Sequence, residues 1–140
     1  MNTDLPEEAK RAKLDLLLVI VGRPSEDEAK LASPSVIFTG FVSDLDMGLL
    51  TSQAQVVLFP SLYEGFGLPV LDAFAASVPV VTSDTSSLPE VAGPAAVLVN
   101  PLSEESIADG IIEGLENRSE LIRKDHQQLK KFSWQKTARM

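Results

Sequence analysis

Apolar residues in this chain occur in short runs separated by amphipathic or polar stretches. The longest run, residues 16–21, is closed by Gly22, and an unbroken apolar run is typical of a strand covered on both faces. Four shorter runs predict further strands at 36–39, 56–59, 79–82 and 95–99. Strands that alternate with helices form parallel βαβ units with right-handed crossovers. The pattern therefore predicts an α/β fold with a doubly wound parallel sheet.

Helix signals fall between these runs. Residues 5–15 are strong helix formers, and Ser43 and Ser103 are expected to cap the N-termini of two further helices. The first of these capped helices has an apolar face made of Leu45, Leu49 and Leu50, and the second has one made of Ile107, Ile111, Ile112 and Leu115. Other helical segments are expected at 68–77, 88–93, 119–131 and from 133 onward.

Residues 59–75 join a strand to a helix through a loop with two glycines. Pro69 suits the first turn of that helix, where its missing N–H group would have no partner in any case. The loop leaves other backbone N–H groups unpaired at a helix N-terminus, which favours an anion such as phosphate. Glu64 and Asp72 flank this position, and their spacing allows both to face one cleft at the carboxyl end of the sheet.

The motif Tyr63-Glu64-Gly65-Phe66-Gly67-Leu68-Pro69, followed by Asp72, resembles the donor-binding signature of the retaining nucleotide-sugar glycosyltransferases of family 4. Members of that family have the two-domain GT-B fold. The resemblance extends from about residue 16 to residue 134 and implies a C-terminal donor-binding domain. The family usually has a second glutamate at the position of Asp72, which is one methylene shorter.

The resemblance implies a role for each motif residue. Glu64 would contact the donor hexose and act as the catalytic carboxylate, and Asp72 would bind the ribose. A solvated acid is the plain alternative for both side chains. The other donor-binding candidates are the backbone amides of Gly65, Phe66, Gly67 and Leu68, the nucleobase loop Gly40-Phe41-Val42, Arg23 at the end of the first strand, and Glu90 in the turn after the fourth.

Composition narrows the classes of function. The net charge of −8 argues against a nucleic-acid surface, which would be basic. The chain has no cysteine and one histidine, so the sequence predicts neither disulfides nor a zinc site. No cofactor or metal is expected besides the nucleotide-sugar substrate. The N-terminus lacks the pattern of a secretory signal, and we expect a cytoplasmic protein, in peripheral contact with a membrane if with any.

Several parts of the family's architecture are missing from residues 1–140, which we interpret as a single domain incomplete at both ends. Residues 1–15 contain neither the family's first strand nor its basic loop. In a doubly wound sheet the first strand is central, so its absence leaves a gap or forces its neighbours together. An unfilled position exposes a strand edge, which favours pairing with a partner chain or with a second copy.

Three functional hypotheses follow. The preferred one is a glycosyltransferase domain that transfers a sugar from a nucleotide diphosphate sugar to an unknown acceptor, with retention and without an obligatory metal. The isolated chain would be inactive without the N-terminal domain or a partner chain that supplies the acceptor site. The alternatives are a non-catalytic α/β interaction module or remnant, and a nucleotide-sugar epimerase-like domain. Fold alone does not separate them.

Overall fold

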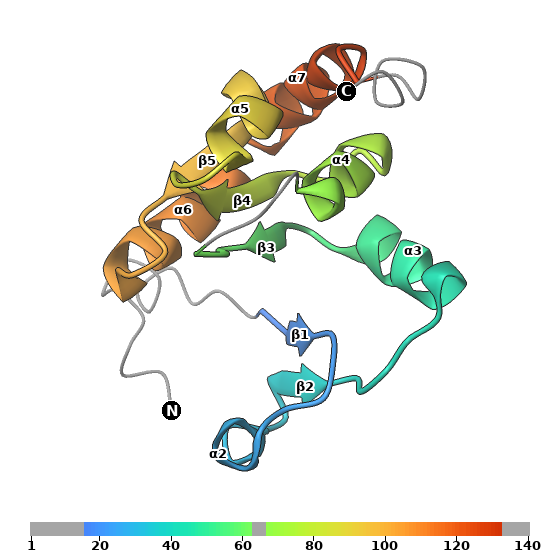
Figure 1. Ribbon diagram of the computed structural model, residues 1–140, viewed down its shortest axis with the longest axis vertical. Helices are drawn as coiled ribbons and strands as arrows, with labels where there is room; N and C mark the ends of the chain where they lie inside the picture. Colours follow the sequence, from blue (N-terminus) through green and yellow to red (C-terminus); the bar gives the residue numbers. More distant parts are fainter. Residues whose placement is uncertain (1–15, 63–66, 133–140) are drawn as a thin grey trace.

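The computed structural model describes residues 16–62 and 67–132 and has an α/β architecture (Figure 1). The predicted helices at 5–15 and from 133 onward lie outside these residues. In chain order, the elements are β1 (Leu18–Ile20), α2 (Glu26–Ala29), β2 (Val36–Phe38), α3 (Asp44–Gln53), β3 (Val57–Phe59), α4 (Leu68–Ala75), β4 (Val80–Ser83), α5 (Leu88–Ala92), η1 (Gly93–Ala95), β5 (Ala96–Val99), α6 (Glu104–Glu116) and α7 (Arg118–Leu129).

All strand pairs are parallel, as predicted, but the strands form two separate sheets. β1 pairs with β2, and β3, β4 and β5 pair in that order. In Figure 1 the β1–β2 ladder lies on one side of β3, and β4 and β5 lie on the other. Among the described residues, the break falls where a central first strand would lie in a doubly wound sheet. That this position is unfilled in the whole chain stays a prediction.

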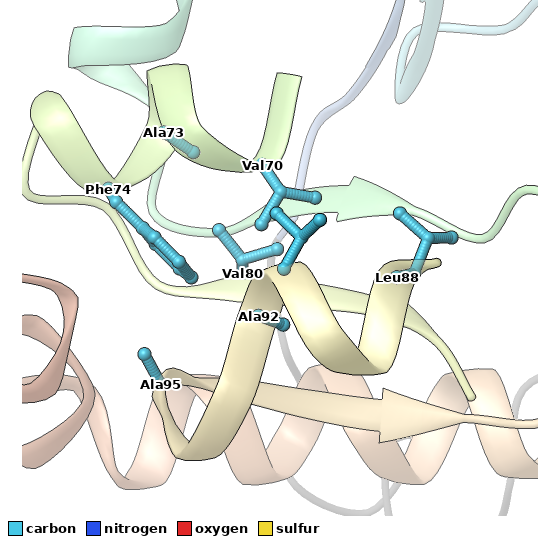
Figure 2. Packing of buried hydrophobic residues seen from close by; sticks show 8 residues of the cluster. Val70, Ala73, Phe74, Val80, Leu88, Ala92 and Ala95 are labelled. Carbon is cyan, nitrogen blue, oxygen red and sulfur yellow. The ribbon is translucent and has the colours of Figure 1, made fainter. Parts of the chain in front are cut away.

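The main hydrophobic core lies between the second sheet and the helices α4 and α5. Phe74, Val70 and Ala73 of α4 are fully buried, and they meet Val80 of β4 and Leu88 of α5 (Figure 2). Ala75 lies outside the stripe formed by residues 70, 73 and 74 and is exposed. Leu71 is half-buried at the edge of the same cluster.

A second apolar cluster lies under α6. Its members are Val81 of β4, Val97 and Val99 of β5, and Leu121 of α7. The predicted isoleucine face of α6 is only half-buried. Gly110 and Gly114 are buried instead, and a Cβ at Gly110 would overlap the side chain of Val99. Glycine thus allows α6 to approach the sheet closely.

The β1–β2 half of the molecule contrasts with these cores. Leu16, Leu17, Leu18, Val19 and Val21 are 37% to 55% exposed, so the expectation of a strand covered on both faces is wrong for the chain as described. α3 leaves Leu45 75% and Leu49 56% exposed, which also contradicts the apolar face predicted for it. Among the described elements α3 packs against α4 and buries none of its own residues. Because the sheet is divided, these side chains have no continuous sheet surface to pack against.

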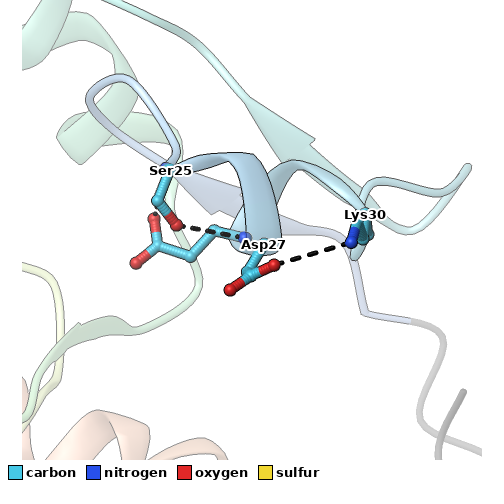
Figure 3. Close-up of polar contacts among 4 residues, drawn as sticks. Ser25, Asp27 and Lys30 are labelled. Atoms are coloured by element: carbon cyan, nitrogen blue, oxygen red, sulfur yellow. Dashed lines mark hydrogen bonds and ion pairs between the residues drawn. The ribbon is translucent and has the colours of Figure 1, made fainter.

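Local polar interactions define the short helices in this half. Ser25 caps α2: its Oγ accepts from the amide of Glu28, and the Glu28 carboxylate accepts from the amide of Ser25. Lys30 pairs with Asp27 across one turn at 3.5 Å (Figure 3). α3 begins in the predicted way, because Ser43 Oγ accepts from the amide of Asp46.

Candidate functional site

The predicted strand–loop–helix unit is present between β3 and α4. Gly67 is the N-cap of α4 and has φ 81° and ψ 42°, the left-handed region that favours glycine. A Cβ at this position would lie 2.8 Å from Leu88 Cδ2, so the start of α5 also requires glycine here. Leu68 is the first residue of α4, and Pro69 lies in its first turn as predicted.

This helix N-terminus has no side-chain cap among the described residues. Its first turn lies at the positive end of the helix dipole, and because Pro69 has no N–H group, the amide of Leu68 is the one that this turn can offer to an anion beside the bonded Val70 amide. The Val70 amide donates a hydrogen bond to the Gly67 carbonyl at 3.0 Å. Glu64, Gly65 and Phe66 of the predicted site lie outside the described residues.

Hydroxyl groups from β4 and the turn after it hold the segment that enters the loop. Thr82 Oγ1 donates to the Phe59 carbonyl at 2.8 Å, and Ser83 Oγ donates to the Ser61 carbonyl at 2.5 Å. Thr85 Oγ1 extends the series to the Leu62 carbonyl at 3.4 Å. These bonds continue the β3–β4 ladder with side chains beyond the last backbone pair, Phe59 with Thr82. They fix the direction in which the chain leaves β3.

The predicted carboxylates near this unit are on the surface. Asp72 is exposed in the second turn of α4, and Glu90 is exposed in α5. α4 and α5 are in contact, and Gly67 packs against Leu88. The structure thus brings the α4 N-terminus, the hydroxyl-rich turn at residues 84–87 and the start of α5 to one region.

The predicted nucleobase and phosphate residues belong to the other ladder. Gly22 and Gly40 form an antiparallel bridge with two 3.1 Å bonds just beyond β1 and β2, and this bridge joins the loops that carry Arg23 and Phe41. Arg23 is exposed, Phe41 is 85% exposed and Val42 is half-buried. Because these residues lie in a different sheet from β3 and β4, their meeting with the α4 N-terminus stays a prediction.

Two of the open grooves formed by the described residues are not lined by Gly67, Asp72 or Glu90. One, of about 370 Å³, lies between β5 and α6. The other, of about 380 Å³, lies along α3 next to Val42. Within the described part of the chain, no group of histidine and acidic side chains has the arrangement of a metal site. No helix there is long and apolar enough to cross a membrane.

Sequence reasoning missed two buried polar features. The first is the set of hydroxyl bonds from Thr82 and Ser83, which the alternation of strands and helices does not reveal, although the hydroxyl-rich turn after β4 is visible in the sequence. The second is Asp125 on α7, which is fully buried in a charged stretch that looks solvated. Burial raises the pKa of Asp125 from 3.8 to about 7.

A parallel α/β domain with a glycine-capped helix at the end of a strand defines the class as a Rossmann-like fold. Comparison with known proteins then gives the family. Residues 3–117 match the family model described as glycosyl transferases group 1, and the chain belongs to that family.

Relatives and solved structures agree with this assignment. The chain is 39% identical over 101 residues to O-antigen chain mannosyltransferase B of Escherichia coli, a match that covers 70% of this chain and 26% of the relative. It is 41% identical over 85 residues to a GDP-mannose-dependent alpha-(1-6)-phosphatidylinositol dimannoside mannosyltransferase of Mycobacterium tuberculosis, which covers 57% of this chain and 22% of the relative. The chain thus spans about a quarter of the length of these curated relatives.

The sucrose-phosphate synthase of Thermosynechococcus elongatus has a similar structure. Its TM-score with this chain is 0.71 at 26% identity, over 91% of this chain and 37% of the synthase. The predicted Rossmann-like fold of a GT-B C-terminal half is therefore confirmed.

Proposed function

We propose that this chain is the donor-binding part of a retaining glycosyltransferase of family 4 that transfers mannose from GDP-mannose. The observation that carries the proposal is the identity of 39% with a mannosyltransferase over most of the chain. The choice of guanine rests on the second relative, whose printed name specifies GDP-mannose as donor. The names of both relatives describe sugar transfer, so the epimerase-like and non-catalytic alternatives are not favoured.

The residues have the following proposed roles. The backbone amides of residues 65–68 hold the diphosphate at the N-terminus of α4, which begins at the left-handed Gly67. Glu64 contacts the hexose and stabilises positive charge on the reacting sugar. Asp72 binds the ribose, the loop 40–42 contacts the base through backbone and apolar groups, and Arg23 and Glu90 complete the donor site.

The reaction also requires an acceptor site, which we assign to polypeptide outside this chain. The acceptor site would come from the N-terminal domain or from a partner chain, and no metal ion is proposed for the leaving diphosphate. We therefore expect the isolated chain to bind donor weakly and to show no turnover. A cytoplasmic location with peripheral contact to a membrane is part of the same proposal.

The test is calorimetric titration of the purified chain with GDP, UDP and ADP. GDP should bind, and Asp72→Ala should weaken that binding by about tenfold to a hundredfold, because one hydrogen bond to a charged group contributes about 1.5–3 kcal/mol. Glu116→Ala is the matched control, because it removes the same charge from an exposed helical position on α6 and should leave GDP binding unchanged.

Other outcomes would revise specific parts of the proposal. Binding of UDP or ADP in place of GDP would contradict the choice of base while leaving the donor site intact. Equal binding by the wild-type chain and Asp72→Ala would remove Asp72 from the site. If no nucleotide binds at millimolar concentration, the chain does not contain a preformed donor site.

A further inference from the structure

β5 is the outer strand of the larger sheet, and its outer edge has no strand partner among the described residues. The Val99 carbonyl accepts from the Asp84 amide at 2.9 Å, so the backbone of Val99 faces β4. Because backbone groups alternate along a strand, those of Leu98 and Ala96 point away from the sheet. Leu98 is 40% exposed. An extended segment placed beside β5 would find unpaired donors and acceptors there.

This edge opens into the groove between β5 and α6. The groove has a volume of about 370 Å³, and β5 residues form one side of it. α6 contributes three exposed carboxylates to the other side: Glu105, Asp109 and Glu113. The ion pairs seen within the described residues, Lys30 with Asp27 and Lys124 with Glu120, involve none of these three.

The spacing of the carboxylates fits an extended partner. Residues four apart on a helix are separated by about 6 Å along its axis. Side chains on one face of a strand recur every two residues, or about 6.6 Å. A strand added to β5 with a basic side chain at every second position would therefore set one cation near each carboxylate of the row.

We propose that the outer edge of β5 is a docking site for an extended segment of another polypeptide with lysine or arginine at alternate positions. Backbone pairing with Leu98 and Ala96 supplies the binding mode, and the three carboxylates of α6 supply the selectivity for basic side chains. A second copy of this chain is a poor occupant, because pairing two β5 edges would place the acidic rows of two chains, each with a net charge of −8, close together. The proposal does not depend on the donor site.

The first test uses the purified full chain and a labelled synthetic peptide, acetyl-Thr-Lys-Val-Lys-Val-Lys-Thr-amide, in a fluorescence polarisation assay. The triple variant Glu105→Gln, Asp109→Asn, Glu113→Gln should bind about tenfold more weakly, as expected for three partly exposed ion pairs. The matched control Glu26→Gln, Asp44→Asn, Asp46→Asn removes the same charge from α2 and α3 and should change affinity by less than about twofold. Equal losses in the two triple variants would overturn the proposal, because attraction to the overall charge would then explain the binding.

The second test isolates backbone pairing. The same peptide N-methylated at alternate residues keeps its charges but cannot form the strand ladder, and we expect it to bind about tenfold or more weakly. Hydrogen exchange at the Leu98 amide should slow when the unmodified peptide is bound. Unchanged exchange together with equal affinity for the methylated peptide would refute strand addition.

Sedimentation without peptide tests the competing occupant. Neutralising the acidic row should leave the chain's self-association unchanged or increase it, because repulsion between copies is reduced. A wild-type dimer that the triple variant abolishes would show that a second copy occupies this edge, and it would overturn the proposal.

Discussion

The Asp125 carboxyl is a buried acid without a partner. It is 0% exposed on α7, and among the described residues neither of its oxygens has a hydrogen-bond partner. Burial disfavours the charged form and raises the pKa of Asp125 to about 7. Between pH 3.8 and about 7 the folded state therefore holds a proton that the unfolded state has released. The contribution of this group to stability falls as pH rises through that window and is constant above it.

We expect Asp125→Asn to stabilise the chain above about pH 7 by roughly 2–4 kcal/mol, because three pKa units correspond to about 4 kcal/mol. The difference in the free energy of unfolding between variant and wild type should shrink as pH is lowered toward about 4. Urea unfolding at several pH values measures it. Glu116→Gln, at an exposed acid on α6, is the control, and a stabilisation by Asp125→Asn that does not change with pH would contradict the buried-charge explanation.

Two glycines in helices give opposite predictions for the same substitution. In α6, a Cβ at Gly110 would overlap Val99 Cγ1 and lie 3.1 Å from Val81 Cγ1. Gly110→Ala should therefore destabilise the fold by about 1–3 kcal/mol through overpacking. In α3, a Cβ at Gly48 meets nothing within 4 Å, so Gly48→Ala should stabilise by about 0.5–1 kcal/mol through helix propensity. Urea midpoints that shift in the same direction would refute the packing of α6.

At the scale of elements, the hydroxyl bonds from β4 make a testable connection between the end of β3 and the end of β4. Thr82 is fully buried, and its hydroxyl is a donor to the Phe59 carbonyl. Thr82→Val keeps the shape of the side chain but leaves that carbonyl without this donor, which should cost about 1–3 kcal/mol. Thr51→Val is the control, because Thr51 makes a similar 2.8 Å bond to Met47 within exposed α3 and its loss should cost less than about 1 kcal/mol.

The Thr82→Val experiment also has a readout at the proposed donor site. Weaker binding of GDP by Thr82→Val, with binding restored in Thr82→Ser, would show that the hydroxyl positions the chain as it leaves β3. Loss of stability without any change in GDP affinity would limit Thr82 to a structural role.

Local signals predicted the elements well because each depends on neighbouring residues. Ser43 and Ser103 cap α3 and α6, Pro69 lies in the first turn of α4, and Gly93 ends α5 with φ 54°. Burial was predicted less well because it depends on distant elements. Residues 16–21 have the pattern of a covered strand, yet the pattern does not determine whether another element covers them, and most of their side chains are exposed.

The candidate site shows the same difference between features that local sequence predicts and features that depend on distant elements. The strand, the left-handed glycine and the helix of the proposed phosphate site follow from a short motif, and the structure places them at the end of β3. The meeting of this unit with the loops at Arg23 and Phe41 depends on how the two sheets are joined. No described strand pair joins the two sheets. The geometry of their junction therefore depends on distant parts of the chain, and no local signal could predict it.

At the scale of the whole molecule, the divided sheet leaves an unusual surface. β1 pairs only with β2, so its other edge has no strand partner among the described residues, and the apolar run around it contains no charge or proline that would block pairing. β3 has a similar free edge on the side away from β4. Exposed apolar side chains beside an open edge favour association with another polypeptide chain.

We therefore expect this chain to self-associate as its concentration rises, in spite of its net charge of −8. Leu17→Lys places a charge in the apolar run, where Leu17 is 55% exposed, and should shift sedimentation toward the monomer. Leu102→Lys is the control, because Leu102 is 80% exposed in the turn after β5 and lies outside the β1–β2 ladder. Association that Leu102→Lys reduces as strongly as Leu17→Lys would point to general apolar exposure. A monomer at all concentrations would mean that the open edge of β1 does not drive pairing of two copies.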